Sequence, residues 1–249
     1  MCSKNQIMEV HHPHHPTHKK NWKEYIVEFV MLFTAVTLGF FAENAREHMA
    51  EKAKKKELLM AVARDFETDL EQFKFHRAFS LAKIKNCDSL IAMNIADPST
   101  VDQKAYYRIF VNTIWWWHLN PNDKSRNEAE AKGYFSEEEN TELAYNISKF
   151  NFFKKDLIDM EAFESEADNA LIKDAPNYTD HKLFDKQVRF PAFEIENKSG
   201  IKKIDPVTAN RINYNYTMLK LCSDIYIMNI DSMTVYANKS IDLIHKKYK

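Results

Sequence analysis

The sequence predicts an all-α protein in which one N-terminal transmembrane helix continues into a long amphipathic helix and then into an uneven helical bundle. Three observations support this prediction. An 18-residue apolar run lies near the N-terminus, apolar residues recur at spacings of three and four through most of the chain, and only three of the 249 residues are glycine. Such spacing is typical of helices, whereas hairpin-rich β folds need many turn residues.

The apolar run YIVEFVMLFTAVTLGFFA, residues 25–42, is the predicted membrane span. As a helix it rises about 27 Å, close to the ~30 Å hydrocarbon thickness of a bilayer. No A-x-A site follows and the helical pattern continues, which distinguishes it from a cleavable signal peptide. Because Glu28 interrupts the run, the alternative is a buried core helix of a soluble protein. We expect a disordered His-rich tail over 1–24 and a helical soluble domain over 43–249.

Turn and capping residues place the helices that follow the span. The first is predicted over 43–95 and ends at Asp97 and Pro98. Ser99, with Asp102 three residues later, forms a capping-box pattern that predicts the start of a second helix, which runs to about His118.

Two further helices are predicted in the second half of the chain. Gly133 closes a short helix or irregular stretch, and Ser136 with Glu139 predicts the cap of a third helix that ends near residue 173. Asp205 caps a final helix with Pro206 in its first turn.

Between these two helices the periodicity is lost. Residues 174–205 are predicted to be irregular, and residues 188–204 could form a small β-hairpin.

Composition excludes several classes of function. The 35 basic and 36 acidic residues nearly balance, so we do not expect nucleic acid as a partner. Three glycines are too few for Gly-rich phosphate cradles or dinucleotide fingerprints. The chain also contains no HExxH or GxSxG motif. We therefore predict a protein that is not an enzyme and that needs no cofactor.

The three cysteines do not form a recognisable motif. Cys2, Cys87 and Cys222 are too far apart for a CxxC pair, and an odd number fits no disulfide framework. Cys87 and Cys222 each fall in a predicted core stripe. We interpret them as buried packing residues, with a bridge between two helices as the alternative.

The tail carries a dense run of histidines. Imidazole nitrogens favour borderline ions such as Zn²⁺, Ni²⁺ and Cu²⁺, so the run is a candidate metal site. The alternative is a solvated tail in which partly protonated imidazoles meet anionic lipid headgroups. The five residues are His11, His12, His14, His15 and His18.

The predicted span has one face suited to association between helices. Glu28, Ala35, Gly39 and Ala42 share that face, and Ala35 with Gly39 forms a small-xxx-small pair. A carboxylate in a membrane helix favours a protein partner over lipid. We therefore expect self-association or docking on another membrane protein. The alternatives are a lone helix in which Glu28 reaches the interface, and a proton relay through Glu28.

Three consecutive tryptophans end the predicted second helix. Trp115, Trp116 and Trp117 together cover about 300° of a helix, so at least one ring must leave the core. We consider them a candidate partner surface, with packing inside the bundle as the alternative.

The segments GFFAENAREH, LLMAVARDFETDLEQ and HLNPND...KGYFSEEENTELAYNISKF resemble an uncharacterised family of single-pass inner-membrane proteins of Gram-negative bacteria. The resemblance covers about 60% of the chain and supplies no active site. It implies a bacterial inner-membrane location and a periplasmic soluble domain, although the basic residues that flank the span slightly favour a cytoplasmic one.

These patterns predict a membrane-anchored helical module. Its expected role is interaction, scaffolding or, as a sensory-type bundle, sensing. Its expected partners are the lipid bilayer and either a second copy or another membrane protein. The alternatives are an accessory subunit of a membrane transport or motor complex and a metal-binding protein that uses its His tail.

Overall fold

The computed structural model describes residues 21–115, 118–189 and 200–248. Within these residues the chain forms six α-helices and two short 3-10 helices, and no strand. The α-helices are α1 (Trp22–Ala92), α2 (Gln103–Ile114), α3 (Lys124–Ala131), α4 (Thr141–Tyr178), α5 (His181–Arg189) and α6 (Pro206–Tyr248). The 3-10 helices are η1 (Pro98–Thr100) and η2 (Glu138–Asn140). The predicted all-α fold with a long N-terminal apolar helix and a helical bundle is confirmed.

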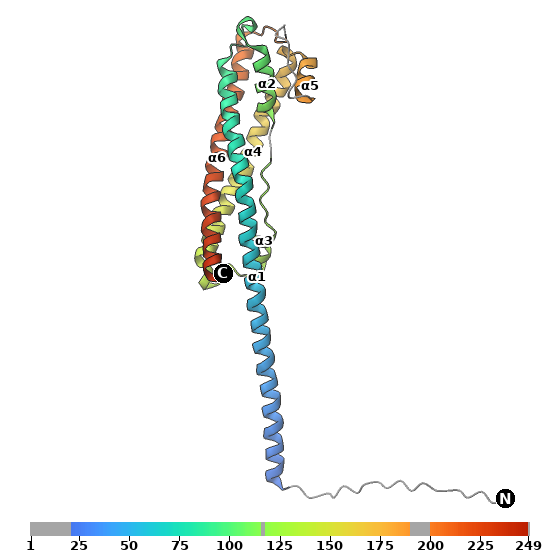
Figure 1. The fold of residues 1–249 in the computed structure, drawn as a ribbon, viewed down its shortest axis with the longest axis vertical. Helices are drawn as coiled ribbons and strands as arrows, with labels where there is room; N and C mark the ends of the chain where they lie inside the picture. Colours follow the sequence, from blue (N-terminus) through green and yellow to red (C-terminus); the bar gives the residue numbers. More distant parts are fainter. Residues whose placement is uncertain (1–20, 116–117, 190–199, 249) are drawn as a thin grey trace, which may run out of the picture. The chain divides into compact units, whose positions relative to one another are not determined.

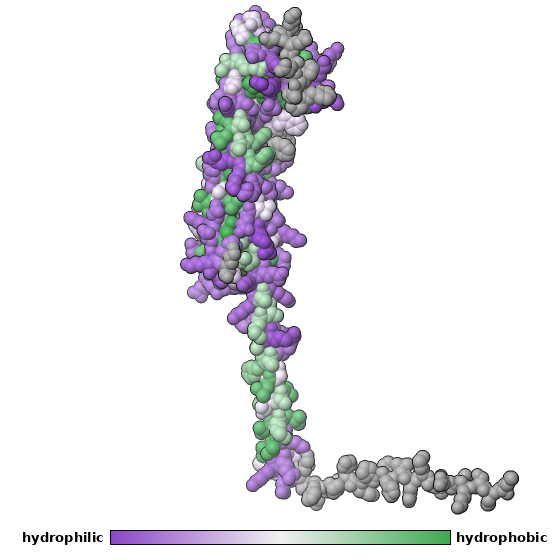
Figure 2. All heavy atoms as spheres, in the orientation of Figure 1, coloured by the Kyte–Doolittle hydropathy of each residue, from purple (hydrophilic) through white to green (hydrophobic). Residues whose placement is uncertain are grey.

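The chain divides into two compact units, residues 1–53 and residues 54–249. In the first unit the described residues belong almost entirely to α1, and hydrophobic side chains cover the segment over 25–42 (Figure 2). This is one helix that is long and apolar enough to cross a membrane, and none of its most apolar 18-residue window is buried. Phe29, Leu32 and Val36 are 67%, 66% and 72% exposed.

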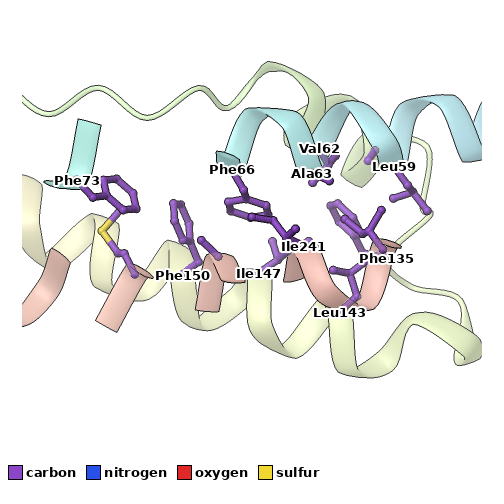
Figure 3. Close-up of a cluster of buried hydrophobic side chains, with 14 of the residues drawn as sticks. Leu59, Val62, Ala63, Phe66, Phe73, Phe135, Leu143, Ile147, Phe150 and Ile241 are labelled. Atoms are coloured by element: carbon purple, nitrogen blue, oxygen red, sulfur yellow. The ribbon is translucent and has the colours of Figure 1, made fainter. Parts of the chain in front are cut away.

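In the second unit, α1, α4 and α6 run side by side as a bundle (Figure 1). Their facing stripes of apolar residues form two separate clusters. The first cluster includes Phe66 of α1 and Phe150 of α4, whose rings meet edge to face with centroids 5.0 Å apart (Figure 3). Residues of α6 from Tyr226 to Ile244 complete it.

The second apolar cluster involves the opposite part of the same three helices together with α2 and the segment that precedes α6. Its α1 members are Cys87 and Leu90. At its centre the hydroxyl of Tyr106 lies 3.1 Å from that of Tyr178 and 3.0 Å from that of Tyr216. These buried bonds satisfy three polar groups inside an apolar environment. They also connect α2, α4 and α6.

The second helix starts and ends differently from the prediction. Asp102, not Ser99, is its N-cap, and the carboxylate accepts a bond of 3.1 Å from the backbone N–H of Ala105. Ser99 belongs instead to η1, where its N–H and hydroxyl donate to Asp97. The helix ends at Ile114 and does not reach His118.

The third helix also differs at both ends. Ser136 does not cap it; the chain passes through η2 and α4 begins at Thr141, with no side-chain bond at its N-cap Asn140. At the other end α4 continues past residue 173 to Tyr178 and contains Pro176 in its last turn. The predicted irregular region therefore begins later than expected.

The possible hairpin over 188–204 is not observed at its described ends. Val188 lies in α5, which occupies a region predicted to be irregular, and residues 200–204 form no strand. The residues between them, 190–199, lie outside the part of the chain that the structure describes.

Two predicted boundaries are confirmed. Gly133 has φ of +71° after α3, in the left-handed region that glycine tolerates at a helix end. Pro206 is the first residue of α6, and Asp205 Oδ1 accepts bonds from the N–H groups of Val207 and Thr208 at 2.9 and 3.0 Å.

Candidate functional site

The predicted association face lies in the first unit, on α1. Glu28, Ala35, Gly39 and Ala42 are all exposed, and a Cβ added at Gly39 would meet no other atom within 4 Å. The five tail histidines, which form the predicted metal site, lie outside the described residues. Among the residues that are described, no group of histidine, cysteine and carboxylate side chains could hold a metal ion.

Of the three candidate tryptophans, only Trp115 is described. It is the C-cap of α2 and is 51% exposed. Its ring lines an open groove of about 580 Å³ whose other lining residues, on α1 and α2, are Phe79, Ala82, Lys83, Asn86 and Asn112. The groove therefore combines aromatic rings, amides and one buried ammonium group.

Lys83 is the unexpected member of this groove, because it is only 1% exposed. Its ammonium nitrogen lies 2.5 Å from Glu164 Oε1 and 3.4 Å from Asp168 Oδ2, both on α4. Asp168 is 2% exposed as a residue, and its Oδ1 atom is buried with no hydrogen-bond partner among the described residues. We refer to Lys83, Glu164 and Asp168 as the buried ionic cluster.

Burial and charge perturb both ends of this cluster. Burial raises the pKa of the Asp168 carboxyl from 3.8 to about 7, against the opposing effect of Lys83. For Lys83, burial opposes the charged form, but attraction to Glu164 and Asp168 outweighs it and raises the pKa. One ammonium faces two carboxylates, so the cluster carries excess negative charge that a proton on Asp168 would neutralise.

The ionic cluster belongs to a wider polar layer across the bundle. On α1 this layer contains His76 and Ser80 as well as Lys83, and on α6 it contains Ser223, all of them buried. The hydroxyl of Tyr226 lies 3.3 Å from His76 Nδ1, and burial lowers the His76 pKa. On α1 and α6 the layer falls between the first and the second apolar cluster, and on α4 it overlaps the start of the second, where Asp168 follows Ala167.

The two buried thiols near the polar layer are not activated as nucleophiles. Burial raises the pKa of Cys87 to about 12 and also raises that of Cys222, so both thiols stay protonated near neutral pH. Both cysteines are free and buried, as the packing interpretation predicted.

A second buried ion pair, between Arg126 and Asp69, connects the segment after α2 to the bundle. Arg126 of α3 is 3% exposed and donates to Asp69 Oδ2 at 3.0 Å. Its guanidinium carbon lies 4.5 Å from the Phe66 ring centroid and 4.8 Å from that of Phe150. Asp69 also accepts a 2.8 Å bond from the N–H of Asn122. These contacts position the loop and α3 against α1.

Sequence reasoning missed the buried ionic cluster, although the signal is present. The core stripe of α1 continues from Phe73 to Cys87 through His76, Ser80 and Lys83, at spacings of three and four. The apolar Ile84 that follows Lys83 is only half-buried. The stripe keeps its spacing of three and four while its residues change from apolar to polar, and this pattern indicates buried polar side chains.

No family model, curated protein or solved structure matches the chain.

Proposed function

We propose that the protein is a membrane-anchored helical interaction module, held in a bacterial inner membrane by residues 25–42, with the bundle on the periplasmic side. One observation carries the proposal, namely the continuous exposure of this apolar segment. Large side chains such as Phe29, Phe33 and Phe40, each at least 61% exposed, would be costly in water. A bilayer removes that cost, since the segment has the required length.

The bundle supports an interaction role more than a catalytic one. Its described interior is filled by two apolar clusters, a polar layer and buried ion pairs. The groove beside Trp115 provides an aromatic and partly polar surface of the kind that protein partners contact. In the proposed scheme the anchor holds the protein at the membrane, and the bundle presents this surface to a partner.

Within the membrane, we propose that the face containing Ala35 and Gly39 pairs with another helix. Small residues allow two backbones to approach closely, and a carboxylate in a membrane helix favours a protein neighbour over lipid. A Gly39→Ile variant should reduce crosslinking through the span several-fold, while Leu38→Ile, one residue away, should leave it unchanged. Equal crosslinking in both variants would exclude this face.

Alkaline carbonate extraction and a topology reporter test the anchor. The full chain should remain in the membrane pellet, and a reporter fused after Lys249 should be active only in the periplasm. A variant with Leu32→Arg and Val36→Arg should move into the supernatant, because each arginine costs about 3 kcal/mol near the centre of a membrane helix. Release of the unaltered chain by carbonate would refute the anchor. A cytoplasmic reporter signal would refute the orientation alone.

A further inference from the structure

Helix α6 carries a second apolar stripe on the side that faces away from the bundle. Tyr214, Leu221, Met228 and Val235 are seven residues apart and are 61%, 50%, 56% and 48% exposed. Val207 continues the series by one more step and is 75% exposed. A soluble surface helix normally has polar residues opposite its buried face, so this repeat needs an explanation.

The stripe lies opposite the core face because of helical geometry. Leu219 and Met233 point into the bundle and are fully buried. Leu221 and Val235 each follow them by two residues, which corresponds to a rotation of about 200° around the helix. The outward residues therefore lie on the far side of α6 from the apolar clusters.

Two half-buried residues complete the outward pattern. Met218 and Ile225 lie between the exposed positions, which gives a spacing of four and three through the sequence, and Met218 also packs against the second apolar cluster. Ser232 occupies the next equivalent place. Alternation of this kind is the a and d pattern of a two-stranded coiled coil, and no charged residue interrupts it. We name the set the outer seam: Tyr214, Met218, Leu221, Ile225, Met228, Ser232 and Val235.

We propose that the outer seam pairs with the outer seam of a second copy of the chain, so that two α6 helices form a parallel coiled coil about a two-fold axis. A straight seam of 21 residues, about 32 Å long, matches a partner helix with the same seven-residue period. A second copy of the chain carries the same outer seam and therefore has the same seven-residue period. Two-fold pairing also places each seam residue beside its own equivalent.

The parallel orientation rests on the proposed membrane anchor. Two copies that insert residues 25–42 in the same direction place both bundles on the same side of the membrane, which favours parallel over antiparallel pairing of their α6 helices.

The available area is consistent with pairing between tethered molecules. Each of the four exposed seam residues can contribute on the order of 100 Å², and their half-buried neighbours add to a total of roughly 600 Å² per copy. Stable interfaces between free proteins bury about 800 Å² per partner. Confinement to a membrane raises the effective concentration and compensates for a smaller contact.

Disulfide crosslinking in native membranes tests both the contact and its direction. The full chain with Cys2→Ser would carry one new cysteine, either Tyr214→Cys or Val235→Cys, and be treated with copper phenanthroline. A parallel pair places each cysteine beside its equivalent, so both variants should form disulfide dimers at least fivefold more than Ala162→Cys, at an exposed position on α4. An antiparallel pair would crosslink only when the two variants are co-expressed, because the sites are about 32 Å apart along the helix.

A charge introduced into the outer seam distinguishes crosslinks formed in a specific dimer from crosslinks formed by random encounters in the membrane. Leu221→Asp added to Val235→Cys should lower the dimer yield at least fivefold, while Ala162→Asp added to the same variant should not. Leu221 is half exposed, so the helical circular dichroism signal should be unchanged. Dimer yields equal to that of Ala162→Cys, or dimers found only in the mixed sample, would overturn the proposal.

Carbonate extraction of the same membranes keeps the two proposals apart. Retention of the chain without self-crosslinking at residues 214 and 235 would refute the pairing and leave the anchor intact. Release of the chain by carbonate would refute the anchor, and with it the argument for a parallel pair.

Discussion

Replacing Lys83 with methionine removes a charge from the bundle while it keeps a side chain of similar length. The ammonium is bound to Glu164 at 2.5 Å and lies 3.4 Å from Asp168. Without it, two carboxylates that are 15% and 3% exposed at the side chain would face each other in a poorly solvated site. Removal of one partner of a buried ion pair typically costs 3–5 kcal/mol.

The lower end of that range applies here, because Asp168 can take up a proton near neutral pH and so escape part of the repulsion. A loss of about 3 kcal/mol in a unit of roughly 200 residues lowers the Tm by about 6–12 °C. The loss should be smaller at pH 5 than at pH 8, since a protonated Asp168 no longer needs the ammonium. Adding Asp168→Asn to Lys83→Met should recover part of the lost stability at pH 8.

Thermal unfolding of the detergent-solubilised full chain, followed by circular dichroism, measures these effects. Lys74→Met is the matched control, since Lys74 is also on α1 and pairs with Glu71, but both side chains are 72% exposed. Exposed pairs contribute little, so its Tm should change by less than about 2 °C. If Lys83→Met and Lys74→Met melted at the same temperature, the buried ionic cluster would not stabilise the fold as argued.

Two further predictions concern the pH dependence of stability and the end of the bundle around α2. The folded-state pKa of Asp168 is raised above its ordinary value of 3.8, so its contribution to the free energy of unfolding is largest below pH 4 and is lost as the pH rises to about 7. Urea titrations from pH 4 to pH 8 should show this decline, by about 2–4 kcal/mol, and Asp168→Asn should flatten it; equal slopes would contradict the assignment. Gly200→Ala should cost about 1–3 kcal/mol, because its Cβ would lie 2.7 Å from Leu183 Cδ1 and 2.8 Å from Tyr107 Cε2. Gly133→Ala, where the added Cβ meets nothing within 4 Å but φ is +71°, should cost only about 1 kcal/mol, and the reverse order in thermal melts would refute the packing argument.

The sequence predicted the helices well wherever one physical signal dominated. Spacings of three and four located the core faces of α1 and α6, and Pro206 after Asp205 fixed the start of α6, because proline is favoured in a first helical turn. Gly133 was equally informative, since few other residues adopt its backbone conformation.

Predictions failed where two local signals competed. Ser99 and Asp102 can both cap a helix, and the choice of Asp102 depends on the 3-10 turn that Asp97 forms with Ser99. Similarly, the capping pattern at Ser136 lost to η2, where Lys55 of α1 binds Glu137 and Glu139. Such tertiary contacts are not visible in a local pattern.

The candidate site was predicted only in part. At least one of the three consecutive tryptophans was expected to leave the core, and Trp115, the one that the structure describes, is half-exposed. The buried ionic cluster was not predicted, since a lysine within a helix is normally solvated. Its burial depends on Glu164 and Asp168, which follow about 80 residues later in the chain. The local sequence of α1 does not show that these two carboxylates will pair with Lys83.

The polar layer has a consequence for how the three long helices align. Core stripes of leucine, phenylalanine and isoleucine allow one helix to slide along another, because a shift by one heptad replaces one apolar contact with another. Such a shift of α1 would carry Lys83 about 10 Å along the axis, away from both carboxylates and towards apolar neighbours. The charged groups therefore specify the register of the three helices, because only one register brings Lys83 to both carboxylates.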